Sequence, residues 1–210
     1  MLLKLVVIMI LIIIITAIIV SVFLSKRNKG YPKNTVIDPL KISIKDIDRM
    51  EDGSDFEEYL YRLFLALGYN DAYKTRGSRD FGSDLVFTDR EGYRNVVQAK
   101  RYSNPVGLGA VQEVYGSMRY YRAKKSMVIS SNQYTSACEE LAGYNAVKLH
   151  NRSDLINIMD LFKSGEINKA KDIIESEPRI ILDSWDNYMN SNKVIKKDFK
   201  AEKRLVTKNK

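Results

Sequence analysis

The sequence predicts an α/β domain with a mixed central sheet flanked by helices, preceded by one transmembrane helix. Three stretches of the chain support this prediction. Residues 84–100 contain two runs with strand-like alternation around an acidic, glycine-containing turn, which is the pattern of an antiparallel hairpin. Residues 126–149 place short apolar runs on either side of a helix-like segment, and a crossover of this kind joins parallel strands. Residues 5–24 form one long apolar run.

The apolar run over residues 5–24 is interrupted only by Thr16 and Ser21. About 20 helical residues, each rising about 1.5 Å, span a hydrocarbon core of about 30 Å, so we expect an uncleaved anchor. A cleaved signal peptide is the alternative, but its apolar region should be shorter and end at a small-residue cleavage site. Basic residues after the run outweigh the single Lys4 before it. This asymmetry predicts a single-pass protein of the cell membrane whose C-terminal part lies in the cytoplasm.

The net charge of +8 at pH 7 is concentrated at the two flanks of the chain. Residues 25–33 and 191–210 are strongly basic, whereas acids slightly outnumber basic residues between 34 and 190. The basic composition therefore does not by itself indicate a DNA-binding domain. One cysteine, Cys138, and one histidine, His150, exclude an internal disulfide framework and a four-ligand structural zinc site.

Composition and patterning divide the chain into five expected segments. They are a transmembrane anchor over 1–25, a juxtamembrane linker over 26–50, an α/β domain over 51–163, a C-terminal helical extension over 164–190 and a basic tail over 191–210. Within the linker, the stretch around Ile42, Ile44 and Ile47 predicts either an edge strand or a short helix. The lysine-rich tail lacks an apolar stripe, so we expect it to stay unfolded.

The first helix of the α/β domain has a recognisable start. Ser54 and Glu57 have the spacing of a capping box, in which each side chain satisfies a backbone N–H of the other. An apolar stripe follows from Phe56 to Leu67, and Gly68 suits the helix end. The pattern therefore predicts a helix here with Glu57 as its reciprocal cap.

Polar side chains stand at the ends of the two strands of the predicted hairpin. Asp84 opens the first strand, while Gln98 and Lys100, two residues apart, close the second strand and point to one face. A carboxylate, an amide oxygen and an ammonium around one point can hold a hard cation such as Mg²⁺ and orient a water. The alternative is a turn-ending Asp and an exposed strand face. The apolar Val96 and Val97 favour a buried strand, whose polar end then requires a reason.

These segments resemble the catalytic core of the PD-(D/E)XK nuclease superfamily and, more narrowly, its Mrr-like restriction endonuclease group. The resemblance lies in GSDLV at residues 82–86 and VVQAKRY at residues 96–102, with further likeness in FEEYLYRLFLALGY, VGLGAVQEVYGSM and SMVISSNQYTSACEELA. It extends over about residues 52–159. In the Mrr-like group a Gln replaces the usual acid of the second strand, as Gln98 does here. The resemblance implies a restriction-endonuclease-like sheet.

The resemblance also implies Mg²⁺-dependent cleavage of double-stranded DNA. Asp84 would bind the metal directly, and the side chain of Gln98 and the carbonyl of Ala99 would supply neutral oxygen ligands. Lys100 would orient or help to deprotonate the attacking water and offset charge in the transition state. Glu57 would be an acid near the metal, which is the alternative to its capping role.

Several residues beside this site are candidate DNA contacts, because basic side chains bind the phosphate backbone. They are Arg76 and Arg79 in the loop before the first strand and Arg101 after the second strand. Gln112, on the next predicted helix, is a further candidate because its polar side chain could face the site. Arg119, Arg122, Lys124 and Lys125 form a second basic cluster. An ordinary solvated surface is the alternative in each case.

The expected function is that of a membrane-anchored DNA endonuclease, and type IV restriction of modified or foreign DNA fits this chemistry. The alternative is a catalytically weak or inactive DNA-binding module that tethers DNA to the membrane. A membrane scaffold alone would leave Asp84, Gln98 and Lys100 unexplained. Cleavage of both strands with one active site per chain favours a homodimer.

Overall fold

The structure, a computed structural model, describes Met9 and residues 12–20, 37–76 and 81–182. It divides the chain into two units, Met1–Ile180 and Ile181–Lys210. Of the second unit only residues 181 and 182 are described, so the fold below belongs to the first unit.

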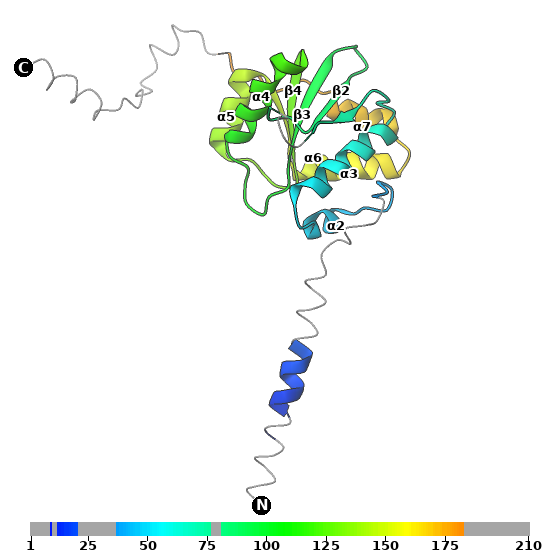
Figure 1. Ribbon diagram of the computed structural model, residues 1–210, viewed down its shortest axis with the longest axis vertical. Coiled ribbons are helices and arrows are strands. Elements are labelled where there is room, and N and C mark those ends of the chain that lie inside the picture. The colour runs from blue at the N-terminus through cyan, green and yellow to red at the C-terminus, as the bar shows by residue number, and fades with distance from the viewer. Residues whose placement is uncertain (1–8, 10–11, 21–36, 77–80, 183–210) are drawn as a thin grey trace, which may run out of the picture. The chain divides into compact units, whose positions relative to one another are not determined.

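A five-stranded mixed sheet forms the centre of the domain (Figure 1). Its strands, in spatial order, are β1 (Tyr73–Lys74), β2 (Leu85–Thr88), β3 (Arg94–Lys100), β4 (Lys125–Ser130) and β5 (Val147–His150). The β1–β2 and β2–β3 pairs are antiparallel, whereas the β3–β4 and β4–β5 pairs are parallel. Both the hairpin and the parallel crossover predicted from the sequence are confirmed.

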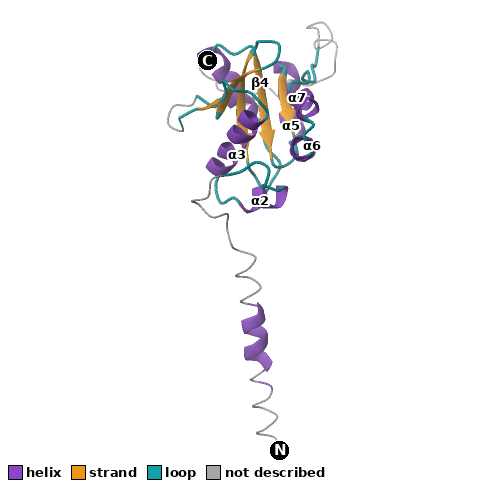
Figure 2. Cartoon of the chain, turned by 90° about the vertical axis from the view of Figure 1, so that its right-hand side faces the viewer, coloured by secondary structure: helices purple, strands orange, loops and turns teal. Residues whose placement is uncertain are grey.

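Helices cover both faces of the sheet (Figures 1 and 2). They are α2 (Ile44–Arg49), α3 (Gly53–Ala66), α4 (Gly109–Tyr121), α5 (Ser136–Asn145), α6 (Arg152–Lys163) and α7 (Ile167–Ile174). The core on one face contains residues of α3, α6 and α7, and the core on the other contains residues of α4 and α5. The domain is therefore a three-layer arrangement with the sheet in the middle.

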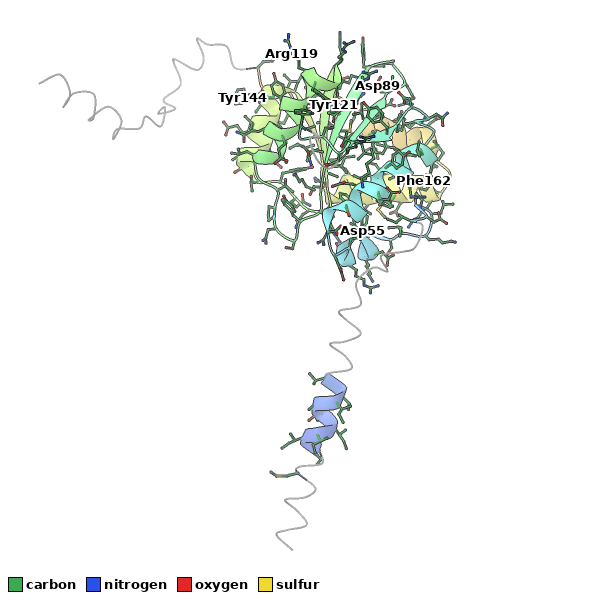
Figure 3. All side chains as sticks on the ribbon, in the orientation of Figure 1. Asp55, Asp89, Arg119, Tyr121, Tyr144 and Phe162 are labelled. Atoms are coloured by element: carbon green, nitrogen blue, oxygen red, sulfur yellow. The ribbon has the colours of Figure 1, made fainter. Side chains whose placement is uncertain are left out.

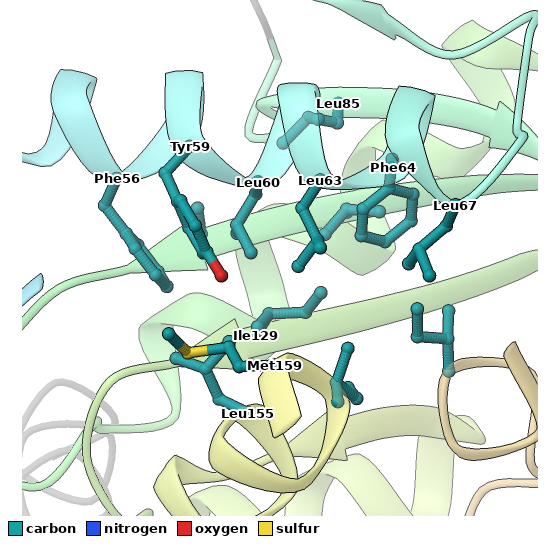
Figure 4. Packing of buried hydrophobic residues seen from close by; sticks show 14 of the residues in the cluster. Phe56, Tyr59, Leu60, Leu63, Phe64, Leu67, Leu85, Ile129, Leu155 and Met159 are labelled. Atoms are coloured by element: carbon teal, nitrogen blue, oxygen red, sulfur yellow. The ribbon is translucent and has the colours of Figure 1, made fainter. Parts of the chain in front are cut away.

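The larger core lies between α3, the sheet and α6. Figure 4 shows Phe56 and Tyr59 of α3 pointing toward Leu155 and Met159 of α6. All of these side chains are buried, and each apolar side chain of this size stabilises the fold by about 1.5–3 kcal/mol. This layer holds α3 against the strands that carry the polar residues singled out above.

The smaller core lies beneath α4 and α5. It contains valines from four strands and from α4, namely Val86, Val96, Val128, Val147, Val111 and Val114, together with Cys138 of α5. Cys138 is fully buried, and burial raises the pKa of its thiol to about 11. The cysteine is thus a packing residue.

The start of α3 differs from the sequence prediction. Asp52 is the N-cap, and its carboxylate accepts hydrogen bonds from the backbone N–H groups of Ser54, at 3.0 Å, and Asp55, at 3.4 Å. The predicted capping box between Ser54 and Glu57 is therefore wrong, because an acid two residues earlier already satisfies these donors. A capping box does form at the start of the preceding helix α2, between Ser43 and Asp46. Of the two predictions for the stretch around Ile42, Ile44 and Ile47, the short helix is therefore correct.

The predicted transmembrane run is described only in part. Residues 12–20 are helical, and the remainder of residues 5–24, apart from Met9, lies outside the described residues. Within the described ranges, none of the helices has both the length and the apolar character needed to cross a bilayer. The basic tail over 191–210 also lies outside the described residues.

His150 makes the stability of the domain depend on pH. Its ring is fully buried, and Nε2 lies 3.2 Å from the carbonyl oxygen of Ile174, so the neutral ring donates a hydrogen bond there. Burial, aided by the charge of Lys148, lowers the pKa of His150 from 6.5 to about 4. The unfolded chain therefore binds a proton at His150 between these values while the folded chain does not.

We predict that this histidine contributes stability that is complete above about pH 6.5 and is lost as the pH falls toward 4. A shift of this size corresponds to about 3 kcal/mol. Urea unfolding of the wild type and of His150→Gln, which keeps a donor but does not titrate, should be compared at pH 7 and pH 4. The free energy of unfolding of the wild type should fall by about 3 kcal/mol more than that of the variant. Equal losses would show that His150 is not the titrating group.

Candidate active site

The candidate site is built on the paired ends of β2 and β3. Asp84 precedes β2, and its backbone N–H donates to the carbonyl oxygen of Val97 at 2.8 Å, which extends the antiparallel ladder by one step. On its other side, the carbonyl oxygen of Asp84 accepts from the N–H of Thr75 at 2.9 Å. The backbone of Asp84 is thus hydrogen-bonded on one side to β3 and on the other side to Thr75, the residue after β1.

The side chain of Asp84 turns toward β3. Its Oδ2 accepts hydrogen bonds from Nε2 of Gln98 at 2.6 Å and from the backbone N–H of Ala99 at 2.7 Å. The carboxylate is 7% exposed, so these bonds form away from bulk water. The meeting of Asp84 with the Gln-x-Lys strand, predicted from the sequence, is present in the structure.

Gln98 presents its amide oxygen to the interior of the site. Its Nε2 is used by Asp84, whereas Oε1 is buried and has no hydrogen-bond partner among the described residues. A buried amide oxygen without a partner costs free energy unless something else binds it. An oxygen in this position suits a ligand for a hard cation.

Lys100 completes the strand end, and its partner was not predicted. Its side chain is 15% exposed, and Nζ forms an ion pair of 2.7 Å with Oε2 of Glu113 on α4. Burial acts to lower the pKa of Lys100, but the hydrogen bond and the charge of Glu113 outweigh burial and raise the pKa. Lys100 is therefore a protonated, hydrogen-bond-donating ammonium beside Asp84.

Glu113 is the residue that the sequence prediction missed. The candidate on this helix was its neighbour Gln112, which is exposed. A signal was present, because Glu113 is the only acid in the sequence between Glu91 and Glu139. A single carboxylate in a basic stretch that follows a candidate catalytic lysine is a reasonable partner for that lysine.

Gly82 brings the loop before Asp84 into contact with α4. Its φ is +87°, and a Cβ at this position would lie 2.6 Å from the carbonyl oxygen of Glu113. Only glycine allows both this conformation and this approach. Glu113 thus contacts both halves of the site, through its backbone at Gly82 and through its side chain at Lys100.

Glu57 lies on α3 and pairs with the edge strand of the sheet. Its Oε2 is 3.3 Å from Nζ of Lys74, and Lys74 stands opposite Leu85, the residue after Asp84. Since Asp52 caps the helix, the capping interpretation of Glu57 is wrong. Glu57 thus lies on the helix that covers the opposite face of the sheet from α4, and its role as an acid near the metal stays a prediction.

The structure describes three of the four predicted DNA contacts. Arg76 is exposed, and Arg79 lies outside the described residues. Arg101 follows Lys100 and donates from Nη2 to the carbonyl oxygen of Glu51 at 3.3 Å, so part of its guanidinium supports the chain before α3. Gln112 points away from the core.

A metal ion fits the residues present at this site. Within the described ranges no three His, Cys, Asp or Glu side chains gather as a metal-binding cluster. The donor set would instead be Asp84, the unpartnered Oε1 of Gln98 and the backbone carbonyl of Ala99, which suits an ion that keeps several of its own waters.

An acid, a neutral oxygen and an ammonium thus meet at adjoining strand ends, and these are groups that can serve metal-assisted hydrolysis. The chain belongs to the restriction endonuclease family: residues 47–159, more than half of its length, match the Mrr-type catalytic domain described as a restriction endonuclease. The family places the chain among the DNA endonucleases.

Two known proteins are similar to this chain. The type IV methyl-directed restriction enzyme EcoKMrr of Escherichia coli (strain K12) is 34% identical over 95 residues, which cover 42% of this chain and 31% of the relative. The chain therefore matches about a third of the length of that relative. The solved structure of the DNA modification-dependent restriction endonuclease AspBHI has a TM-score of 0.43 and 20% identity, and the match covers 70% of this chain and 45% of AspBHI.

We predict that Gly82→Ala destabilises the domain more than Gly92→Ala. Both glycines have positive φ, +87° and +83°, but a Cβ at Gly92 would meet nothing within 4 Å. Each alanine incurs backbone strain of about 1–2 kcal/mol, and only the one at Gly82 also displaces α4, at a further cost of about 1–3 kcal/mol. Urea unfolding of the two variants measures the difference, and equal destabilisation would show that the loop can move away from Glu113 freely.

Proposed function

We propose that the chain is a Mg²⁺-dependent DNA endonuclease that hydrolyses phosphodiester bonds. The observation that carries the proposal is the convergence of Asp84, Gln98 and Lys100 at the ends of two adjoining strands, in a chain of the restriction endonuclease family. The arrangement combines an anionic oxygen, a neutral oxygen and a fixed ammonium, which are the groups that metal-assisted hydrolysis requires.

Asp84 and Gln98 would hold the cation, with the carbonyl of Ala99 as a third ligand. The unpartnered Oε1 of Gln98 supports this assignment. A bound Mg²⁺ lowers the pKa of its water and neutralises charge on the phosphate. Because Gln98 is neutral, the protein supplies less negative charge than two acids would. The phosphate of the substrate is then expected to contribute to metal affinity.

Lys100 would act on the water and on the phosphate. Its Nζ can donate to the attacking water, and its charge offsets the negative charge that develops on the phosphorus-bound oxygens. In the reaction the water would lose a proton to the solvent as its oxygen bonds to phosphorus, the bond to the leaving oxygen would break, and that oxygen would take up a proton from the solvent, so that one water is added overall. Glu113 would hold Lys100 at the correct place from the side of α4.

We further propose that modified or foreign DNA is the biological substrate. Support comes from the similarity to EcoKMrr, which is named as a methyl-directed type IV enzyme. Cleavage of both strands would be achieved by a homodimer, since each chain carries one site. Residues 5–24 would anchor the protein in the cell membrane as a single span, and the basic residues that follow would keep the catalytic domain in the cytoplasm.

We predict that Asp84→Ala and Lys100→Ala abolish cleavage of plasmid DNA, with a loss of at least about a thousandfold. The first variant should also lose its response to Mg²⁺, whereas the second should largely keep DNA binding. Full-length protein should nick or cut plasmid with Mg²⁺ and not with EDTA. Lys41→Ala, at an exposed position before α2, is the matched control. Binding without cleavage in any divalent metal would favour the alternative, a module that tethers DNA.

We predict that the C-terminus lies in the cytoplasm. An alkaline phosphatase fused there should be inactive, whereas a green fluorescent protein fused there should fluoresce in the membrane fraction. An active phosphatase would contradict the predicted orientation. An N-terminus cleaved near Ser25 would contradict the anchor.

A further inference from the structure

An exposed aromatic pair lies beside the candidate active site. The ring centroids of Phe81 and Tyr120 are 4.2 Å apart, yet Phe81 is 52% exposed and Tyr120 is 62% exposed. Tyr121 extends the group, with its ring edge-on to Tyr120 at 4.9 Å. Rings that stack on one another while remaining largely in water bury little area, and a cluster of this kind is typical of a contact surface.

The backbone holds this pair in place against its own preference. Phe81 has a φ of +52°, a left-handed conformation that is rare for a bulky side chain. Gly82, with a φ of +87°, follows directly and lies against the backbone of Glu113. Two successive residues of positive φ thus fix the ring of Phe81 over α4. Strained conformations of this sort persist where the surroundings or the function require them.

The pair is adjacent to the residues proposed to cut DNA. Phe81 is three residues before Asp84 in the chain. Tyr120 is seven residues after Glu113 on the same helix, or about 10 Å along the helix axis. A duplex whose phosphate lies at Asp84 and whose axis follows α4 would therefore meet Phe81 first and Tyr120 farther along the helix.

The charge at the C-terminal end of α4 suits a polyanion. No acid occurs in the sequence between Glu113 and Glu139, a stretch that contains Arg119 and Arg122, and both of these side chains are exposed. Figure 3 shows Arg119 and Tyr121 at the same end of α4. A second copy of the chain would bring two such basic surfaces together and be repelled, whereas DNA offers phosphates to the arginines and flat bases to the rings.

We propose that Phe81 and Tyr120 form a DNA-contact surface that packs against a base step or its sugars beside the cleaved phosphodiester, while Arg119 and Arg122 bind the neighbouring phosphates. This inference rests on the proposed endonuclease function and adds to it a site for distorted duplex DNA. Aromatic wedges of this kind act by unstacking a base step, and a step that already stacks poorly is the easiest to distort.

Binding of a fluorescent duplex to the full chain in mild detergent, with EDTA to block hydrolysis, tests the proposal. Phe81→Gly removes the ring and also relieves the strained φ, so the Tm should stay near that of the wild type while the Kd rises about tenfold. Tyr120→Ala should weaken binding by a similar factor, and Tyr120→Phe should restore it. Tyr144→Ala, at an exposed aromatic on α5, is the control and should bind like the wild type.

The salt dependence of the Kd separates the two kinds of contact. The aromatic variants should keep the wild-type slope of log Kd against log salt, whereas Arg119→Ala and Arg122→Ala should each reduce it by about one. Unchanged Kd values for Phe81→Gly and Tyr120→Ala would overturn the inference. So would sedimentation data in which these variants turn a dimer into a monomer with undiminished DNA affinity per chain. A wild type that shows the expected pattern but never cuts DNA would refute the endonuclease function and leave this surface standing.

Discussion

The two hydrogen bonds that converge on Oδ2 of Asp84 determine the geometry of the whole site. They come from Gln98 and Ala99 on the neighbouring strand, so the carboxylate and the Gln-x-Lys segment cannot move independently. The antiparallel register of β2 and β3 is the condition for both bonds. A slip of one residue would turn Gln98 and Lys100 to the opposite face and remove the site entirely.

The charges around this site are largely balanced within the protein. Lys100 pairs with Glu113, and Lys74 pairs with Glu57, so two ammonium groups are held by acids that arrive from different helices. Both acids are thus fixed by tertiary packing instead of by neighbours in the sequence. Under the proposed function, a cation and a phosphate would enter a site whose ammonium groups are already paired, which favours binding them together over binding either one alone.

The central part of the site could be predicted because it depends on local rules. Strand alternation and a hairpin turn suffice to bring Asp84, Gln98 and Lys100 together. The role of Glu113 could not be predicted in this way, because Glu113 and its neighbour Gln112 are both exposed and only the rotation of α4 on the sheet brings the carboxylate of Glu113 to Lys100. The same limit applies at the start of α3. Both Asp52 and Glu57 were possible acceptors for the backbone N–H of Ser54, and in the structure Asp52 accepts this hydrogen bond.

The sheet divides the apolar interior into two unequal parts. Among the described residues, the core beneath α3, α6 and α7 includes buried aromatic rings such as Phe64 and Phe87, while the core beneath α4 and α5 consists mostly of valine and alanine, with Tyr134 as its buried ring. Less apolar area anchors the second layer, so opening it locally costs less free energy than opening the first. The helix that carries Glu113 therefore belongs to the softer side of the domain. Strands β2 and β3 thus pack against the larger core at one face and the smaller core at the other, and we expect local opening to reach the α4 side first.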